Sequence, residues 1–260
     1  MPIGRPVASL PMYDWPEIRW AHDALWNAIG ARLRAAGVPA PDRLDRSRPS
    51  EDVWLDAGLV LSQTCGYPFS RRLIGKVRLV GTPVYAVEGC DGPYYSTCIV
   101  ARRGEGKRLP DFRNRRFAKN SDDSLSGYVT LRVAMVEAGL HPDAAEWVAT
   151  GGHRASVRAV AGEEADIASI DAICWALAKE YEGEAAAKLE IIARTPLRPG
   201  LPFITALGRP PDDIARIHAA IRDTLADPAS EAPRAALHLA DVAMVAEAAY
   251  APLAALLRRD

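Results

Sequence analysis

Short apolar segments alternate with amphipathic segments along almost the whole chain, and this alternation constrains the fold more than any other feature. Strands that alternate with helices form mixed or parallel sheets covered by helices on both faces. The strand-like segments are residues 7–10, 42–46, 57–62, 77–85, 94–103, 115–120, 189–195 and 203–206, with further short strands just before Thr150 and Asp171. The helical segments are residues 16–37, 125–138, 153–162 and 171–181, followed by a helical tail over 207–260. The pattern predicts an α/β protein.

The length and charge of the chain limit its organisation and its partners. With 260 residues it can form two lobes, and the C-terminal tail is too short for a domain of its own. We expect the tail to pack on the first lobe, so that lobe one is 1–86 plus 203–260 and lobe two is 87–202. The net charge of −1 gives no electrostatic reason to expect a nucleic-acid partner.

No apolar run is long enough for a membrane span, and the first residues lack the pattern of a secretory signal peptide. The expected location is therefore the cytoplasm, or the periplasm if a signal segment has been removed.

The four cysteines, Cys65, Cys90, Cys98 and Cys174, form no CxxC pair and have no histidine at metal-ligand spacing. We therefore expect no metal and no cofactor. Cys65 and Cys90 lie beside glycines, and in an oxidising compartment they are candidates for a disulfide. Cys98 and Cys174 lie in apolar segments, which is typical of core thiols.

The segment Asn120–Tyr128 follows a predicted strand and opens a helix. Ser124 and Ser126 are good N-cap residues, and Gly127 allows close approach to the backbone. Unpaired N–H groups at a helix start, flanked by hydroxyls, bind anions. The alternative is ordinary helix capping by serine, without a ligand.

Two more strand ends carry polar groups. His153 follows Thr150 and two glycines at a helix start, where it can donate to an oxyanion, with Arg154 or Arg158 adding charge. The alternative is a loop histidine with a structural partner. Asp171 ends an apolar strand and can accept a hydrogen bond from a ligand, although it can also cap the next helix. Ligands of open α/β sheets bind at the carboxyl ends of the strands.

The first and third predicted strands also end in polar or aromatic groups. Tyr13 follows the first strand, and Gln63, Thr64 and Tyr67 follow the third. In five loops, polar or aromatic groups thus follow directly after a predicted strand. This shared placement favours a common binding site over five separate structural explanations.

The segments SQTCGYPF, GCDGPYYSTCIVAR, NSDDSLSGY, TGGHRASVRAVAGEEADIASID and RPGLP occur in this order. Together they resemble the phosphonate/phosphite-type substrate-binding proteins of ABC importers, over about residues 7–206. The resemblance implies a type II periplasmic-binding-protein fold, with two α/β lobes, a mixed sheet in each lobe and the ligand cleft between them.

The resemblance also implies roles for the candidate residues. In that family the SxSG helix start holds the oxyanion, which here assigns Ser124, Ser126 and the Gly127 backbone, with Tyr128 next to them. His153 corresponds to a further donor, and Asp171 to the acceptor of a protonated ligand group. Tyr13, Thr64 and Tyr67 match the aromatic and polar groups of the other lobe. The further acidic residue that usually binds an aminoalkyl group has no match here, so another oxyanion or a heterocycle stays an alternative ligand.

These observations favour a monomeric solute-binding protein for a small, anionic molecule, with an ABC permease as partner and no enzyme activity. One alternative is an enzyme on the same fold, with Cys65 as nucleophile, His153 as base and Asp171 orienting the base. Cys65→Ala separates the two, because only an enzyme would lose turnover. Another alternative is a cytoplasmic ligand sensor.

Overall fold

The computed structural model describes residues 4–257, and its internal contacts divide the chain into two compact units. Of the described residues, unit 1 contains 4–86 and 199–251, and unit 2 contains 87–198 and 252–257. The sequence-based bounds differ at two places: they assign 199–202 to lobe two and the end of the chain to lobe one.

Unit 1 is built on a five-stranded mixed sheet with the order β1-β2-β12-β3-β13. Its strands are β1 (Val7–Ser9), β2 (Leu59–Gln63), β12 (Phe203–Ala206), β3 (Val77–Tyr85) and β13 (Leu239–Ala243). β1 is parallel to β2, whereas β12 runs antiparallel to both β2 and β3. β1, β2 and β3 therefore point in one direction, and their carboxyl ends lie at the same edge of the sheet.

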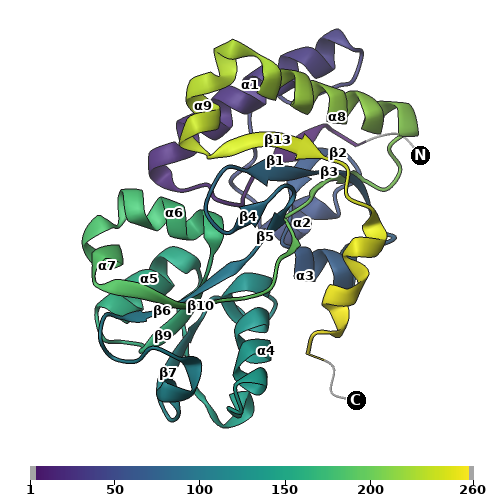
Figure 1. Cartoon of the computed structure of the whole chain (residues 1–260). Helices are drawn as coiled ribbons and strands as arrows, with labels where there is room; N and C mark the ends of the chain where they lie inside the picture. Colours follow the sequence, from purple (N-terminus) through teal and green to yellow (C-terminus); the bar gives the residue numbers. More distant parts are fainter. Residues whose placement is uncertain (1–3, 258–260) are drawn as a thin grey trace. The chain divides into compact units, whose positions relative to one another are not determined.

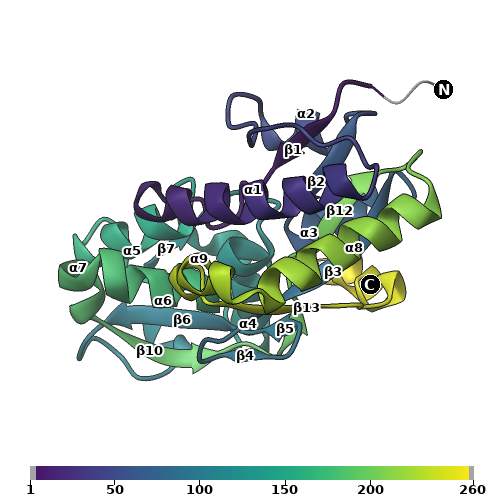
Figure 2. The ribbon, with the colours of Figure 1, turned by 90° about the horizontal axis from the view of Figure 1, so that it is seen from above.

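Three helices cover one face of this sheet: α1 (Arg19–Ala35), α8 (Pro211–Ala226) and α9 (Glu231–Ala236). α1 contacts both α8 and α9, and it runs beside α8 over the strands (Figures 1 and 2). α1 follows a short 3-10 turn at Pro16–Ile18 and ends before Gly37, whose φ of +78° suits glycine. Its inward face is apolar at helical spacing and consists of Ala21, Leu25, Ile29 and Leu33. The remaining helical turns of unit 1 are α2 (Ser50–Trp54), α3 (Gly66–Pro68), η2 (Phe69–Leu73), η6 (Pro228–Ser230) and η7 (Glu247–Ala249).

Unit 2 is built on a second five-stranded mixed sheet, with the order β10-β6-β9-β7-β8. Its strands are β10 (Leu189–Arg194), β6 (Thr97–Arg102), β9 (Ile167–Asp171), β7 (Arg116–Lys119) and β8 (Glu146–Ala149). β7 is parallel to both β8 and β9, whereas β6 is antiparallel to β9 and β10. The helices of this unit are α4 (Thr130–Glu137), α5 (His153–Ala161), α6 (Ala172–Tyr181) and α7 (Gly183–Ala187), with the shorter turns η3 (Leu109–Phe112), η4 (Leu125–Val129) and η5 (Pro142–Ala144).

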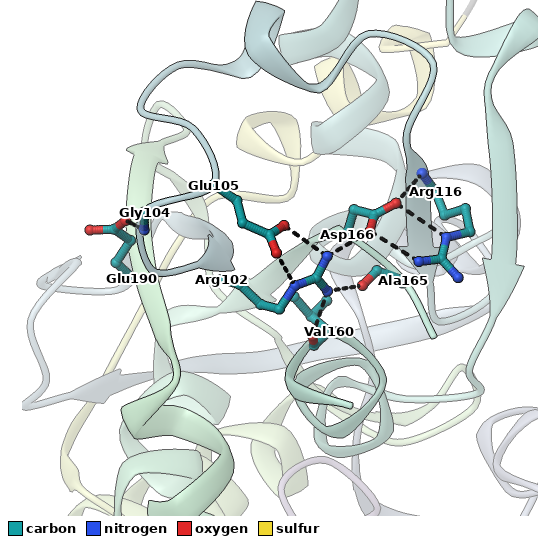
Figure 3. Close-up of polar contacts among 8 residues, drawn as sticks. All are labelled: Arg102, Gly104, Glu105, Arg116, Val160, Ala165, Asp166 and Glu190. Carbon is teal, nitrogen blue, oxygen red and sulfur yellow. Dashed lines mark hydrogen bonds and ion pairs between the residues drawn. The ribbon is translucent and has the colours of Figure 1, made fainter. Parts of the chain in front are cut away.

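A cluster of ion pairs holds the amino-terminal end of β9 (Figure 3). Asp166 accepts from the Nη2 of Arg102 at 2.6 Å and from the Nε of Arg116 at 3.2 Å, while the backbone N–H of Arg116 donates to it at 2.9 Å. Burial acts to raise the pKa of Asp166, but the hydrogen bonds from Arg116 and Arg102 outweigh it and hold the pKa well below its ordinary range. The cluster thereby joins β6, β7 and β9, and two of these strands, β7 and β9, carry loops described below.

Two predictions of secondary structure are wrong. Residues 42–46 form no strand, because Asp45 and Arg46 instead make ion pairs with Arg48 and Asp14 in an irregular loop. The tail over 207–260 is not all helical, since β13 lies within it and pairs with β3. The residues on both sides of this short strand are rich in alanine, which favours the prediction of a helix. The segment is a strand because it pairs with β3, and no local sequence pattern indicates this. A small sheet of β11 (Arg198–Pro199), β5 (Tyr94–Tyr95) and β4 (Cys90–Asp91) was not predicted as a sheet, although β5 lies within the predicted strand 94–103.

Candidate functional site

Three parallel strands of unit 2 end at one edge of its sheet, and each continues into a polar loop. β7 leads to Asn120 and the start of η4, β8 leads to Thr150 and α5, and β9 ends at Asp171, which begins α6. Parallel pairing brings these carboxyl ends together, which is where ligands bind in open α/β sheets. Direct side-chain contacts between the loops, described next, show that they meet.

The first loop opens a helix through a serine cap. The Ser124 hydroxyl accepts from the backbone N–H of Gly127 at 3.0 Å, which makes Ser124 the N-cap of η4, a turn that continues into α4. Asn120 Nδ2 donates to the same hydroxyl at 3.5 Å. The two interpretations of this segment, a helix cap and an anion site, therefore concern the same helix start. Unpaired N–H groups and the helix dipole favour an anion there.

Ser126 and His153 form the contact that joins the first two loops. The Ser126 Oγ lies 2.9 Å from His153 Nε2, and the Ser169 hydroxyl on β9 donates to the Ser126 carbonyl. Burial lowers the pKa of His153 to about 4, with the backbone of Ser169 acting weakly in the opposite direction. The ring is therefore neutral at pH 7 and acts as a hydrogen-bonding group without a charge.

A second layer of hydroxyls supports these groups, and sequence reasoning did not assign it to the site. Ser156 Oγ donates to Asn120 Oδ1 at 3.1 Å, and it lies 2.6 Å from the Thr150 hydroxyl, which in turn reaches the Lys119 carbonyl. Ser156 follows His153 by three positions on α5, so it lies on the same helix face. That spacing was the available signal, but serine at such a spacing is too common to stand out.

Two candidate residues near this edge, Asp171 and Tyr128, have structural partners of their own. The Asp171 carboxylate accepts from the N–H of Ile173 at 2.8 Å and of Cys174 at 3.3 Å, so it caps α6, and its ligand role stays a prediction. Tyr128 packs against Trp147 at 4.8 Å between ring centroids, and Arg132 donates to its phenol oxygen at 2.9 Å. Figure 1 places α4, which follows Tyr128, alongside the strands of unit 2.

The arginines that were expected to add charge near His153 are both paired. Arg154 and Arg158 each donate to the Glu182 carboxylate, with N–O distances of 2.5 and 2.6 Å. The two guanidiniums share one carboxylate, so the three groups keep a net charge of +1, and the role of these arginines at the site stays a prediction.

The four candidates of unit 1 fall into two pairs. Tyr13 and Gln63 lie at the carboxyl ends of β1 and β2 and line one cavity. Thr64 is fully buried and donates to the Cys65 carbonyl at 3.3 Å. Tyr67 is 2% exposed, and its phenol accepts from Arg71. The structure thus brings Tyr13 and Gln63 together, and neither Thr64 nor Tyr67 lines that cavity.

Over residues 4–257, no group of three or more metal-ligating side chains could hold an ion. All four cysteines lie in this range and are free thiols, with Cys98 and Cys174 buried as predicted. Within the same range, no helix combines the length and apolar character needed to cross a membrane.

Comparison with known proteins identifies the family. The family model described as "ABC transporter, phosphonate, periplasmic substrate-binding protein" matches residues 71–250, more than half of the chain. No curated protein sequence matches the chain significantly. Among solved structures, PhnD1 from Prochlorococcus marinus in complex with methylphosphonate is similar with a TM-score of 0.76 and 11% identity, covering 97% of each chain.

Two further structures share the fold. A Xanthomonas citri protein bound to chloride ion has a TM-score of 0.73 and 14% identity, covering 96% of each chain. A binding-protein component of a phosphonate ABC transporter from Pseudomonas aeruginosa has a TM-score of 0.72 and 15% identity, covering 97% of this chain and 85% of that one. These neighbours confirm the expected fold of two-lobed periplasmic binding proteins with mixed sheets. The chain therefore belongs to the family of periplasmic substrate-binding proteins of phosphonate ABC transporters, and its role is to bind a solute, not to catalyse a reaction.

Proposed function

We propose that the protein binds a small solute through an oxyanion group, held in unit 2 at the start of η4 by Ser124, Ser126 and the Gly127 backbone, with His153 beside them. The observation that carries this proposal is the 2.9 Å contact between Ser126 Oγ and His153 Nε2, which gathers neutral donors from two loops at one helix start. A helix start with hydroxyls around it can neutralise an anion without a charged side chain.

The neutral ring of His153 indicates how the charge of the solute is balanced. Because its pKa is about 4, the imidazole carries no charge at pH 7, and Arg154 and Arg158 are occupied by Glu182. The helix start supplies further positive potential for the oxyanion. Phosphonate, phosphite or phosphate groups fit such a site, and the methylphosphonate complex of the Prochlorococcus marinus protein supports this ligand class.

The family membership supports an ABC permease as the partner that receives the solute, and a periplasmic location. Cys65, the nucleophile of the enzyme alternative, precedes α3 in unit 1, whereas His153 pairs with Ser126 and Asp171 caps α6 in unit 2. A monomer acting without nucleic acid is part of the proposal, and the near-zero net charge supports the absence of a nucleic-acid partner.

A thermal-shift panel tests the proposal: phosphate, phosphite, methylphosphonate, sulfate and acetate, each added to the purified protein. A solute at about 100 times its dissociation constant adds roughly 2.7 kcal/mol of stability, enough to raise Tm by a few degrees. We expect a rise with at least one phosphorus oxyanion. A rise with none of the oxyanions, together with a rise for an uncharged heterocycle such as thiamine's pyrimidine, would contradict the anion site while leaving the binding role intact.

A further inference from the structure

Unit 2 contains a hollow that is separate from the candidate site. Its lining comes from the end of η3, the end of α4, the first half of β7 and η5, so it lies within unit 2 alone. Ser124 caps the start of the helical run formed by η4 and α4, whereas Met135, which lines the hollow, lies near the end of that run. The hollow and the proposed oxyanion site are therefore at opposite ends of the run.

The inner wall of the hollow is apolar. Phe112, Phe117, Met135 and Leu140 line it, and all four belong to one buried cluster of the core. Phe112 is placed by a tight turn, in which the backbone N–H of Arg115 donates to the Phe112 carbonyl at 3.1 Å. Leu140 is folded back toward α4, because its N–H donates to the Met135 carbonyl at 2.8 Å. A group that enters the hollow thus meets aromatic and aliphatic carbon.

The rim of the hollow is polar and positively charged. Arg113, Asn114 and His141 line it, and all three are exposed. In the described part of the chain, the Arg113 guanidinium makes no hydrogen bond and no ion pair. No aspartate or glutamate is among the described residues that line the hollow. The charge at the rim therefore favours an anion, and the imidazole of His141 offers a further N–H donor.

The carboxylates that flank the hollow in the sequence are engaged elsewhere. Asp111 accepts from the backbone N–H groups of Lys107 and Arg108, each at 3.0 Å. Asp143 pairs with Arg132 at 2.5 Å. Because neither carboxylate is paired with Arg113, this guanidinium keeps its five N–H donors for a ligand.

The size of the hollow limits the apolar part of a ligand. Its volume is about 100 Å³, and an apolar cavity of about 150 Å³ takes up benzene. The rim residues are exposed, so only the apolar part needs to fit inside while a charged head group stays at the surface. A body of about four to six carbon atoms meets this condition.

We propose that this hollow is a second binding site, which takes a small monocarboxylate with an apolar body of about four to six carbon atoms. The carboxylate pairs with Arg113, since its planar shape and single charge match one guanidinium fork. The apolar body lies against Met135 and Leu140. The site differs from the proposed solute site in its place and in its chemistry, and it does not depend on the oxyanion proposal.

NMR of the methionine methyl groups tests the inference, because Met135 lines the hollow and the chain has only four methionines. Benzoate is the main probe, since an aromatic ring shifts the resonance of a methyl group beside it. We expect a saturable shift of the Met135 methyl resonance, with a dissociation constant on the order of 1 mM. The Met12 and Met244 resonances should stay in place. The spectrum of Met135→Leu identifies the reporting resonance.

Two matched probes separate the head group from the body. Benzamide keeps the ring and loses the charge, and we expect it to bind about threefold more weakly than benzoate, which is the effect of one exposed ion pair. Acetate keeps the charge and loses the ring, and we expect no saturable shift of the Met135 methyl resonance with it.

Variants give an independent arm. Arg113→Gln should weaken benzoate binding by about threefold and leave benzamide binding unchanged. Arg115→Gln is the matched control, because Arg115 is also exposed but does not line the hollow. Ala145→Leu fills the hollow from its half-buried edge and should abolish the shift of the Met135 methyl resonance. The probe series needs only the wild-type protein, so the inference stays testable if a variant fails to fold.

The outcomes decide between this site and the alternatives. Equal affinity for benzoate and benzamide, or an equal loss in Arg113→Gln and Arg115→Gln, would overturn the carboxylate site. Shifts of Met12 or Met244 as large as that of Met135 would show general surface binding, and no shift of Met135 would show that the hollow does not admit the ring. Either result overturns the proposal. A protein whose Met135 responds as expected but that binds no phosphorus oxyanion would keep this site and lose only the proposed solute site.

Discussion

At the scale of single residues, the candidate site depends on the close packing of Gly127 against Asn120 as well as on hydrogen bonds. Gly127 lies so near Asn120 that an added Cβ would stand 2.3 Å from the Asn120 side chain. Asn120 in turn connects Ser124 with Ser156. A side chain at position 127 would therefore disturb the loop that carries both serines.

Gly127→Ala should lower the free energy of unfolding by about 1–3 kcal/mol and weaken oxyanion binding, because Asn120 must move away. Gly208→Ala is the control, since an added Cβ there meets nothing within 4 Å. Urea denaturation of both variants measures the difference. Equal stability of the two would show that Asn120 yields without cost.

The buried imidazole makes stability depend on pH. The pKa of His153 is about 4 in the folded protein and about 6.5 in the unfolded chain, so the unfolded state takes up the proton first as pH falls. Stability is complete above about pH 6.5 and falls by up to about 3 kcal/mol on the way to pH 4. Asp14 and Asp45, whose pKa values are lowered to about 2, act only below about pH 4.

Denaturation of wild type and His153→Asn at pH 7, 5.5 and 4.5 measures this effect. We expect the wild type to lose stability across this range and the variant to lose less. Parallel pH curves for the two proteins would mean that the ring titrates normally and is not neutral through burial.

At the scale of elements, β9 is the strand that positions the candidate site of unit 2. It supplies Ser169 to Ser126 at one point and Asp171 to the start of α6 at another. Its amino-terminal end is tied to β6 and β7 by Asp166, whose side chain is 5% exposed. The ion pairs, drawn in Figure 3, thus fix the strand at the end opposite to Asp171.

Asp166→Asn should cost about 2–3 kcal/mol of stability, because it removes the buried carboxylate that Arg102 and Arg116 share and leaves Arg102 with Glu105 alone. Asp223→Asn, in the exposed pair with Arg222, should cost under about 0.5 kcal/mol. Thermal unfolding of both variants checks the contrast. A small effect at position 166 would show that water replaces the carboxylate, and that β9 is held by its backbone pairing alone.

Local pattern predicted most elements, and it failed where tertiary pairing decides. The helix start at Ser124 and the strand ending at Asp171 are visible in the sequence, because capping residues and apolar runs have local causes. β13 was missed because only its pairing with β3 makes it a strand. In the site, the Ser126–His153 contact could be predicted, because two parallel strands end beside each other. The supporting hydroxyl of Ser156 and the apolar cavity beside Tyr85 could not be predicted in this way. Both depend on three-dimensional packing that a single sequence does not encode locally.

At the scale of the whole molecule, each unit contributes a distinct chemistry. Unit 2 gathers hydroxyls and a neutral imidazole at a helix start, whereas unit 1 encloses an apolar cavity with aromatic walls. A protein that only binds and releases a solute needs donors of this kind and no activated nucleophile. That agrees with membership in a family of substrate-binding proteins.

We expect the purified protein to sediment as a single 260-residue chain, with or without added methylphosphonate. Analytical ultracentrifugation at two concentrations is the appropriate check. A concentration-dependent dimer would contradict the monomer that we propose.

The most direct test of the oxyanion site is a calorimetric titration of methylphosphonate into wild type and the Ser124→Ala/Ser126→Ala double variant, with Ser47→Ala as a control on an exposed loop of unit 1. Each hydroxyl that donates to a charged group contributes about 1–3 kcal/mol. We predict that the double variant loses at least about 30-fold in affinity, which corresponds to about 2 kcal/mol, while Ser47→Ala binds like wild type. Unchanged affinity in the double variant would contradict the account, because the oxyanion would then be bound elsewhere.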